Sequence, residues 1–136
     1  MTLRGWTICA VAAVSFAAGS MTRALADSNR IFELRVYHVV PGKLPALEAR
    51  FRDTASNLLA KHGMDAVGYW SPEDPAAGNV FVYMLAHPSM DAAKKNWADL
   101  FKDPDFQQMM KEEQAGKTVE KVDDTYLHPT DFSPMK

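Results

Sequence analysis

The chain has 136 residues, of which 47% are hydrophobic and 24% are charged, and its formal net charge is −2. This composition is typical of one globular domain and argues against a disordered protein. The chain lacks the basic excess with which a nucleic-acid-binding protein neutralises phosphates. Its single cysteine, Cys9, excludes an internal disulfide and a cysteine-rich zinc site.

Residues 1–26 have the pattern of a secretory signal peptide. They contain no Asp or Glu, begin with a positive charge at Arg4, and continue with an uncharged apolar run over residues 6–18. The small residues Ala24 and Ala26 match the preference of signal peptidase, so we expect cleavage directly after Ala26. The mature protein would then be periplasmic or secreted.

The same segment has two alternative interpretations. A membrane anchor is one, but the apolar run is shorter than the roughly 20 residues that a membrane span needs. A mitochondrial transit peptide is the other, although the compact apolar centre argues against it. Cleavage would leave a domain of residues 27–136 with no cysteine, which excludes thiol catalysis. Its net charge would be −4, because Arg4 and Arg23 are removed and every acidic residue stays.

The rest of the chain predicts the order strand, helix, strand, strand, helix, strand. The strands are rich in β-branched and aromatic residues, and the helices carry apolar residues three and four apart. We expect strands over 31–40, 65–70, 80–86 and 118–127, a first helix over 44–62, a second helix capped by Ser89, and a short helix from Asp103-Pro104 to Gly116. The apolar run 80–86 predicts an inner strand, and the charges in 118–127 predict an edge strand.

This order predicts an α+β fold, the ferredoxin-like βαββαβ sandwich, with a four-stranded antiparallel sheet and helices on one face. In the first strand we expect the set Phe32, Leu34 and Val36 to face the helices and the alternate set Glu33, Arg35 and Tyr37 to face away, or the reverse. In either case the second face of the sheet is too apolar to remain wet over its whole area. We therefore expect a homodimer, sheet against sheet, which forms a dimeric α+β barrel.

Five segments resemble the NIPSNAP family of the dimeric α+β barrel superfamily, in the order in which that family has them. They are 32–37 (FELRVY), 41–44 (PGKL), 68–70 (GYW), 103–107 (DPDFQ) and 127–134 (LHPTDFSP). The family usually has Trp where this chain has Phe106. The resemblance implies the ferredoxin-like fold and the dimer, and it implies no particular reaction. Related barrels include cofactor-free monooxygenases and haem-binding or haem-degrading enzymes, an analogy at the level of the fold.

Six residues are candidates for binding a small ligand. His38 would line the gap between sheet and helices if it shares the face of Leu34, and Arg35 could anchor an anion. Aromatic side chains could line a pocket, and the candidates are Tyr37, Trp70, Tyr83 and Trp97. Each candidate has a structural interpretation as well: His38 could simply end a strand, Arg35 could pair with Glu33 across the dimer, and the aromatics could be core.

We assign structural roles to the remaining polar residues. His62 lies in the last turn of the first helix, where it could cap carbonyl groups. His87 precedes a proline and reads as a solvated linker residue. The acids Asp103, Asp105, Glu112 and Glu113 read as a solvated helix face.

The sequence leaves several functions open. The first is a protein that binds, and in one version oxidises, an apolar or aromatic molecule between sheet and helices. The second is a non-catalytic assembly module with a filled interior. The third, haem binding, needs an axial His that faces the interior. No metal motif and no cofactor-binding motif is visible, so we predict neither a metal nor a cofactor.

Overall fold

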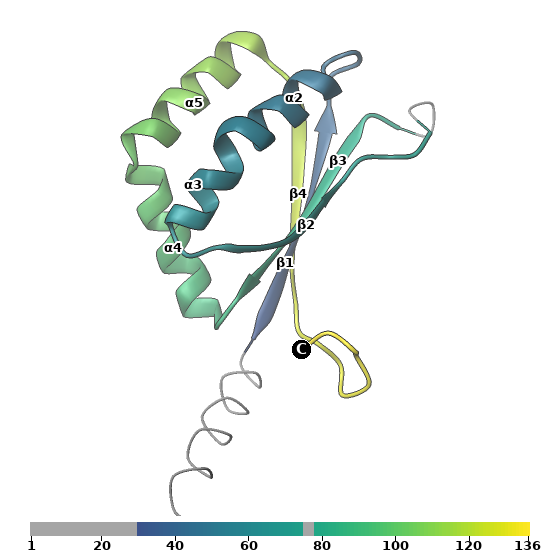
Figure 1. The fold of residues 1–136 in the computed structure, drawn as a ribbon, viewed down its shortest axis with the longest axis vertical. Helices are drawn as coiled ribbons and strands as arrows, with labels where there is room; N and C mark the ends of the chain where they lie inside the picture. Colours follow the sequence, from purple (N-terminus) through teal and green to yellow (C-terminus); the bar gives the residue numbers. More distant parts are fainter. Residues whose placement is uncertain (1–29, 75–77) are drawn as a thin grey trace, which may run out of the picture.

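The computed structural model describes residues 30–74 and 78–136. The predicted signal peptide, 1–26, lies outside the described residues. The described part is a four-stranded antiparallel sheet in the order β2-β3-β1-β4, with its helices on one face (Figure 1). The strands are β1 (Ile31–Val39), β2 (Asp65–Trp70), β3 (Val80–His87) and β4 (Val119–Leu127). The predicted fold class is confirmed, with β3 inside the sheet and β4 at an edge.

The first helical segment is interrupted by a π turn that the sequence analysis did not predict. It runs as α2 (Leu44–Arg50), the π turn η1 (Phe51–Ala55) and α3 (Ser56–Lys61). Its buried side chains Leu47, Phe51, Ala55 and Leu59 are four residues apart. Successive steps of four overshoot the 3.6-residue turn of an α-helix, and the wider π turn keeps these side chains on one face.

The second helical segment consists of two helices of similar length, α4 (Met90–Lys102) and α5 (Pro104–Gly116). Ser89 caps α4 as predicted, because its side chain accepts a hydrogen bond from the amide of Ala92. Asp103 caps α5 in the same way through the amide of Asp105. The second helix of this pair has the predicted bounds, with Asp103 as its cap, Pro104 at its first position and Gly116 at its end.

The preferred assignment of the two faces of β1 is wrong, and the reverse holds. Glu33, Arg35 and Tyr37 stand opposite Leu85, Tyr83 and Phe81 in the register of β1 and β3. Directly opposed residues share a face, and these three β3 side chains belong to the core beneath the helices. The charged pair therefore points inward. The alternation alone could not decide this, because both sets contain large side chains.

The opposite face of the sheet carries no helix (Figure 1). Its central side chains are Leu34 and Val36 from β1 and Val82 and Met84 from β3, all of them half-buried. The C-terminal segment reaches only one end of this face, where Pro129 and Met135 lie beside Phe32, Leu127 and Met84.

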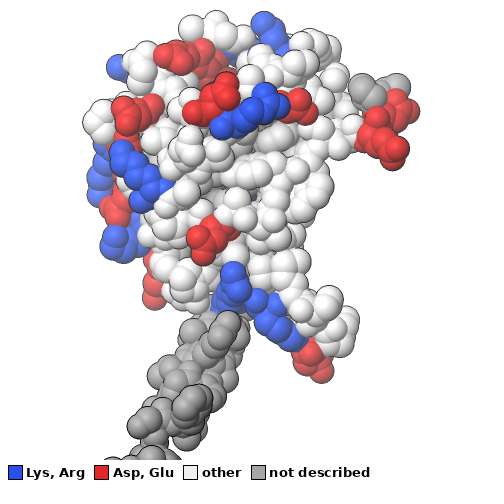
Figure 2. Space-filling model, in the orientation of Figure 1, with Lys and Arg blue, Asp and Glu red and all other residues white. Residues whose placement is uncertain are grey.

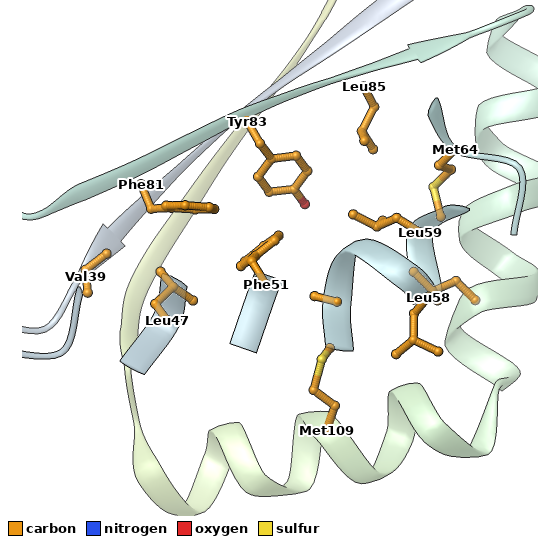
Figure 3. Close-up of a cluster of buried hydrophobic side chains, with 12 residues drawn as sticks. Val39, Leu47, Phe51, Leu58, Leu59, Met64, Phe81, Tyr83, Leu85 and Met109 are labelled. Atoms are coloured by element: carbon orange, nitrogen blue, oxygen red, sulfur yellow. The ribbon is translucent and has the colours of Figure 1, made fainter. Parts of the chain in front are cut away.

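The core lies between the sheet and the helices. Figure 3 shows Phe81, Tyr83 and Leu85 extending from β3 toward Phe51 and Leu59 of the first helical segment. The rings of Phe51 and Phe81 are 4.7 Å apart between centroids, and those of Phe51 and Tyr83 are 5.1 Å apart. Phe51, at the start of the π turn, is thus at the centre of an aromatic cluster that holds this segment on the sheet.

Two of the four acids that we expected on a solvated helix face are buried or nearly so. Asp103, 6% exposed, accepts hydrogen bonds from His62 at 2.7 Å and Lys61 at 2.8 Å, besides capping α5. These bonds tie the end of α3 to the junction of α4 and α5. His62 therefore binds a carboxylate, whereas we expected it to cap carbonyl groups. Burial opposes the charge of Asp103, but the bonds from Lys61 and His62 lower its pKa far below the usual range.

Charge on the outer surface is mixed. On the face shown in Figure 2, acidic and basic side chains alternate over the helical layer, and the middle of the face is largely uncharged. Within residues 30–74 and 78–136, no helix is long and apolar enough to span a bilayer.

Candidate functional site

A pocket of about 310 Å³ lies between the sheet and the helices. Its polar lining at one end comes from Arg35 and Tyr37 of β1 and Tyr83 of β3. Its walls are mostly apolar or aromatic and include Phe51, Ala55, Leu59, Trp97, Leu100, Phe106 and Met109. Phe101 and Val122 also line the pocket and are 56% and 37% exposed, so the pocket reaches the surface between α4 and β4.

Directly beside the pocket lies a buried carboxylate with three partners. Glu33 is fully buried, and its Oε1 accepts a hydrogen bond from Nη1 of Arg35 at 2.8 Å. Its Oε2 accepts from the indole of Trp97 at 2.7 Å and lies 2.9 Å from Nε2 of His87. Both carboxylate oxygens are thus occupied by groups from β1, β3 and α4, as a buried charge requires.

These partners decide the protonation of Glu33. Burial by itself would raise the pKa of this carboxyl group. The hydrogen bonds from His87 and Trp97 and the positive charge of Arg35 outweigh burial, so the pKa of Glu33 lies below its ordinary value of 4.5. Glu33 is therefore ionised at neutral pH and holds the Arg35 guanidinium in place.

Arg35 lies between this carboxylate and the pocket. Its guanidinium carbon is 4.5 Å from the centroid of the Trp97 ring and 6.0 Å from that of Tyr37. Burial works against its charge, but the interactions with Tyr83 and Tyr37 and the hydrogen bond to Glu33 outweigh burial and raise the pKa of Arg35. Its buried Nε has no hydrogen-bond partner among the described residues. Arg35 is thus a permanent cation with donor capacity that the described protein does not use.

Two tyrosines complete the polar end of the pocket. The hydroxyl oxygens of Tyr37 and Tyr83 are 3.3 Å apart, so that one hydroxyl donates to the other. Burial raises the pKa of Tyr83 well above its ordinary value, and this hydroxyl keeps its proton at any physiological pH.

The pocket lining also contains a second arginine–glutamate pair, Arg50 and Glu113. Glu113 Oε1 accepts from the amides of Thr118 and Val119, each at 2.9 Å. Its Oε2 accepts from the Thr118 hydroxyl and from Arg50. Burial alone would raise the pKa of Glu113, but these donors together lower it. Glu113 therefore fastens the end of α5 to the start of β4.

Four of the six candidate residues line this pocket, namely Arg35, Tyr37, Tyr83 and Trp97. His38 does not, because its face of β1 points away from the helices, where it binds Asp123 at 2.8 Å. Trp70 is 49% exposed and lies at the edge strand β2, beside a separate hollow of about 470 Å³ that Glu48 and Ser71 also line. His38 and Trp70, the other two candidates, therefore do not line this pocket.

The residues of the pocket do not fit haem. No histidine of the described ranges lines it, so the axial ligand that this interpretation required is missing. In the same part of the chain, no three His, Cys, Asp or Glu side chains are grouped so that they could hold a metal ion.

Sequence reasoning missed His87, which is fully buried and binds Glu33. We expected a solvated linker residue because Pro88 follows it. A signal for the correct placement was present, since His87 continues the alternation of Phe81, Tyr83 and Leu85 on the inner face of β3. Its Nδ1 has no hydrogen-bond partner among the described residues.

Comparison with known proteins places this fold in a family. The model of the NIPSNAP family matches residues 32–134. The chain belongs to the NIPSNAP family. The match covers both arginine–glutamate pairs and the whole of the pocket, and it confirms the resemblance found in the sequence. A search of curated proteins gave no match.

Solved structures of NIPSNAP proteins have the same fold. A NIPSNAP family protein from Agrobacterium tumefaciens is 23% identical, with a TM-score of 0.71, over 79% of this chain and 100% of that one. A second protein of the family from the same organism, described as of unknown function, is 24% identical with a TM-score of 0.71, over 80% and 96% of the two chains. SnoaB, a cofactor-independent oxygenase from Streptomyces nogalater, is 16% identical with a TM-score of 0.54, over 78% and 98%. These likenesses show the fold alone.

Proposed function

We propose that this NIPSNAP protein binds a small apolar or aromatic molecule in the pocket between its sheet and helices. The observation that carries the proposal is a pocket of about 310 Å³ with mostly apolar walls and a charged donor, Arg35, at one end. Ligand sites are commonly concave and apolar, have volumes of about 300–1,000 Å³ and contain few polar groups. The pocket is at the lower end of this range, which suits a molecule of one to three rings.

The alternative, a non-catalytic assembly module, predicted a filled interior. The pocket speaks against that alternative, since protein interiors are normally close-packed and a filled interior would leave no such space between sheet and helices. An ordinary core that left such a space empty would lose the dispersion contacts of its lining.

A binding screen tests the proposal. The thermal midpoint of the full chain would be measured with aromatic acids, quinones and haem, and we expect an increase with at least one ring compound. In the variant Ala55→Leu, a larger side chain intrudes on the pocket and abolishes that increase. Ala46→Leu makes the same change on the exposed side of α2 and keeps it. Equal increases in both variants would place the binding elsewhere and contradict the proposal.

Oxidation of the bound molecule is the enzymatic form of this proposal. Its support is the fold shared with SnoaB, which is named as a cofactor-independent oxygenase. Oxygen uptake by the purified chain with each ligand from the screen tests it. Uptake that the Ala55→Leu variant loses supports an oxygenase, and its absence with every bound ligand leaves a binding protein.

We propose further that a second copy of the chain covers the open face of the sheet. The support is the half-buried apolar patch of Leu34, Val36, Val82 and Met84, which a dimer would remove from water. Sedimentation velocity would give a dimer for the native chain and a folded monomer for Val82→Lys. A native monomer at micromolar concentration contradicts this proposal.

We also propose that the chain is exported and cleaved after Ala26, so that the domain acts outside the cytoplasm. Mass spectrometry of the protein produced in a bacterial host tests this, with a mature N-terminus at Asp27 as the expected result. An intact Met1 in an exported, membrane-bound form would favour the anchor instead.

A further inference from the structure

The polar end of the pocket contains hydrogen-bond donors without matching acceptors. Arg35 donates to Glu33 through Nη1 only, and its buried Nε has no partner among the described residues. A buried donor of a charged group that lacks an acceptor destabilises the folded protein. The Nε atom itself is out of reach of the pocket, but the Arg35 side chain lines the pocket and is 18% exposed, and its second terminal nitrogen, Nη2, donates to no group of the described residues.

The tyrosine pair adds to this excess of donors. Tyr37 and Tyr83 share one hydrogen bond between their hydroxyl groups, which uses one of their two hydroxyl hydrogens. The other hydrogen has no acceptor within the part of the chain that the structure describes. Because Arg35 stands opposite Tyr83 in the register of β1 and β3, the guanidinium and the two hydroxyls converge on one region.

No acceptor at this end is free to satisfy these donors. Both oxygens of Glu33 are already bonded, to Arg35, Trp97 and His87. The one carboxylate among the described lining residues, Glu113, already accepts four hydrogen bonds, from Arg50, Thr118 and Val119. A neutral hydrocarbon in the pocket would leave the donors unsatisfied, whereas an anionic oxygen would satisfy them.

We propose that the ligand of this pocket is an aromatic molecule that carries an anionic oxygen group, a carboxylate or a phenolate, bound by Arg35 and by the hydroxyl groups of Tyr37 and Tyr83. This inference rests on the proposed binding function and specifies its ligand class. Charge-assisted bonds from a guanidinium are among the strongest that a pocket can offer an oxyanion. The flat walls of Trp97 and Phe51 suit the ring.

A series of three probes with the same ring tests the proposal on the unaltered full chain. Calorimetry would compare 1-naphthoate, the neutral 1-naphthalenemethanol and the cationic 1-naphthylmethylamine. We expect the carboxylate to bind about tenfold or more tightly than the alcohol, and the amine to bind least. 1-Naphthol, titrated below and above the pH of its ionisation, distinguishes a phenolate from a carboxylate as the preferred group.

The outcomes separate this inference from the function on which it rests. If the alcohol binds as tightly as the carboxylate, or the amine binds best, the anionic ligand class is wrong and the pocket still binds ring compounds. If no ring compound in this series or in the wider thermal screen binds, the proposed function fails, and this inference fails with it.

Two pairs of variants locate the anion. Arg35→Met removes the preference for naphthoate over the alcohol, and Arg35→Lys, which keeps the charge and stays beside Glu33, retains part of it. Tyr37→Phe reduces the preference several-fold. Tyr69→Phe deletes a hydroxyl on the same face of the sheet, outside the pocket lining, and leaves the preference unchanged. An unchanged preference in both Arg35→Met and Tyr37→Phe would overturn the assignment.

Discussion

Two arginine–glutamate pairs lie at one pocket and do different things. The Arg35 and Arg50 side chains are about equally exposed, at 18% and 17%. Glu113 accepts two backbone amides in addition to Arg50, so that pair joins α5 to β4. Glu33 accepts only side chains, and they come from β1, β3 and α4.

The difference shows what makes an ion pair structural or available for binding. The carboxylate of Glu113 accepts hydrogen bonds from backbone amides, which need an acceptor wherever a loop is buried. The carboxylate oxygens of Glu33 instead position two flat groups that line the pocket, the Arg35 guanidinium and the Trp97 indole. Four predictions test this difference between the Glu33 and Glu113 pairs.

The largest effect is expected for Glu33→Gln. The change removes a fully buried charge and leaves the Arg35 cation without its partner, and loss of one member of a buried pair costs about 3–5 kcal/mol. Urea unfolding measures the free energy of unfolding. Glu120→Gln, on the exposed side of β4, is the control and should change it by no more than about 0.5 kcal/mol. Similar values for both variants would show that the Glu33 network does not stabilise the fold.

A smaller and more local effect is expected for Glu113→Gln. This carboxylate is 12% exposed, and water can replace part of what it loses, so we expect a loss of about 2 kcal/mol. Amide hydrogen exchange should accelerate at Thr118 and Val119, whose amides would then donate to the weaker, neutral amide oxygen of glutamine in place of a carboxylate. Unchanged protection at these two amides would contradict the fastening role.

Trp97→Phe separates the contribution of the indole hydrogen bond to stability from the contribution of the aromatic ring. Phenylalanine keeps an aromatic face for Arg35 but cannot donate to Glu33, and a hydrogen bond to a charged acceptor contributes about 1.5 kcal/mol. Thermal and urea unfolding would give the loss. A variant as stable as the native chain would mean that His87 and Arg35 alone satisfy Glu33.

The smallest contribution per group is expected in the pH dependence of stability. The pKa of Glu33 and that of Glu113 are lower in the folded chain than their ordinary value of 4.5, which holds in the unfolded chain. Each therefore stabilises the fold above that value and loses its contribution as the pH falls through the lower, folded pKa. The free energy of unfolding should decline as the pH falls below the ordinary value of 4.5, and less steeply in Glu33→Gln. Equal slopes in the two proteins would contradict a lowered pKa at Glu33.

The sequence predicted the element order, the inner position of β3 and the edge position of β4 well, because apolar runs and charge patterns report burial directly. It also led to Arg35 and three aromatic residues of the pocket. It could not decide whether His38 and Trp70 line the pocket, because alternation along a strand separates two faces without saying which of them the helices cover. Since Glu33 and Arg35 are charged, ordinary burial preference assigned them to the wrong face.

The hydrophobic period, the capping residues and the helix breakers along the chain were sufficient to predict the ferredoxin-like fold, since each acts on neighbouring residues. The family came from the resemblance of five short segments. The burial of Glu33, the role of His87 and the unmatched donors of Arg35 depend on side chains 54 and 64 residues apart that meet only when β1, β3 and α4 are assembled. A charged pair is tolerable inside a protein only where such distant partners surround it. Local patterns contain no information about which distant partners those are.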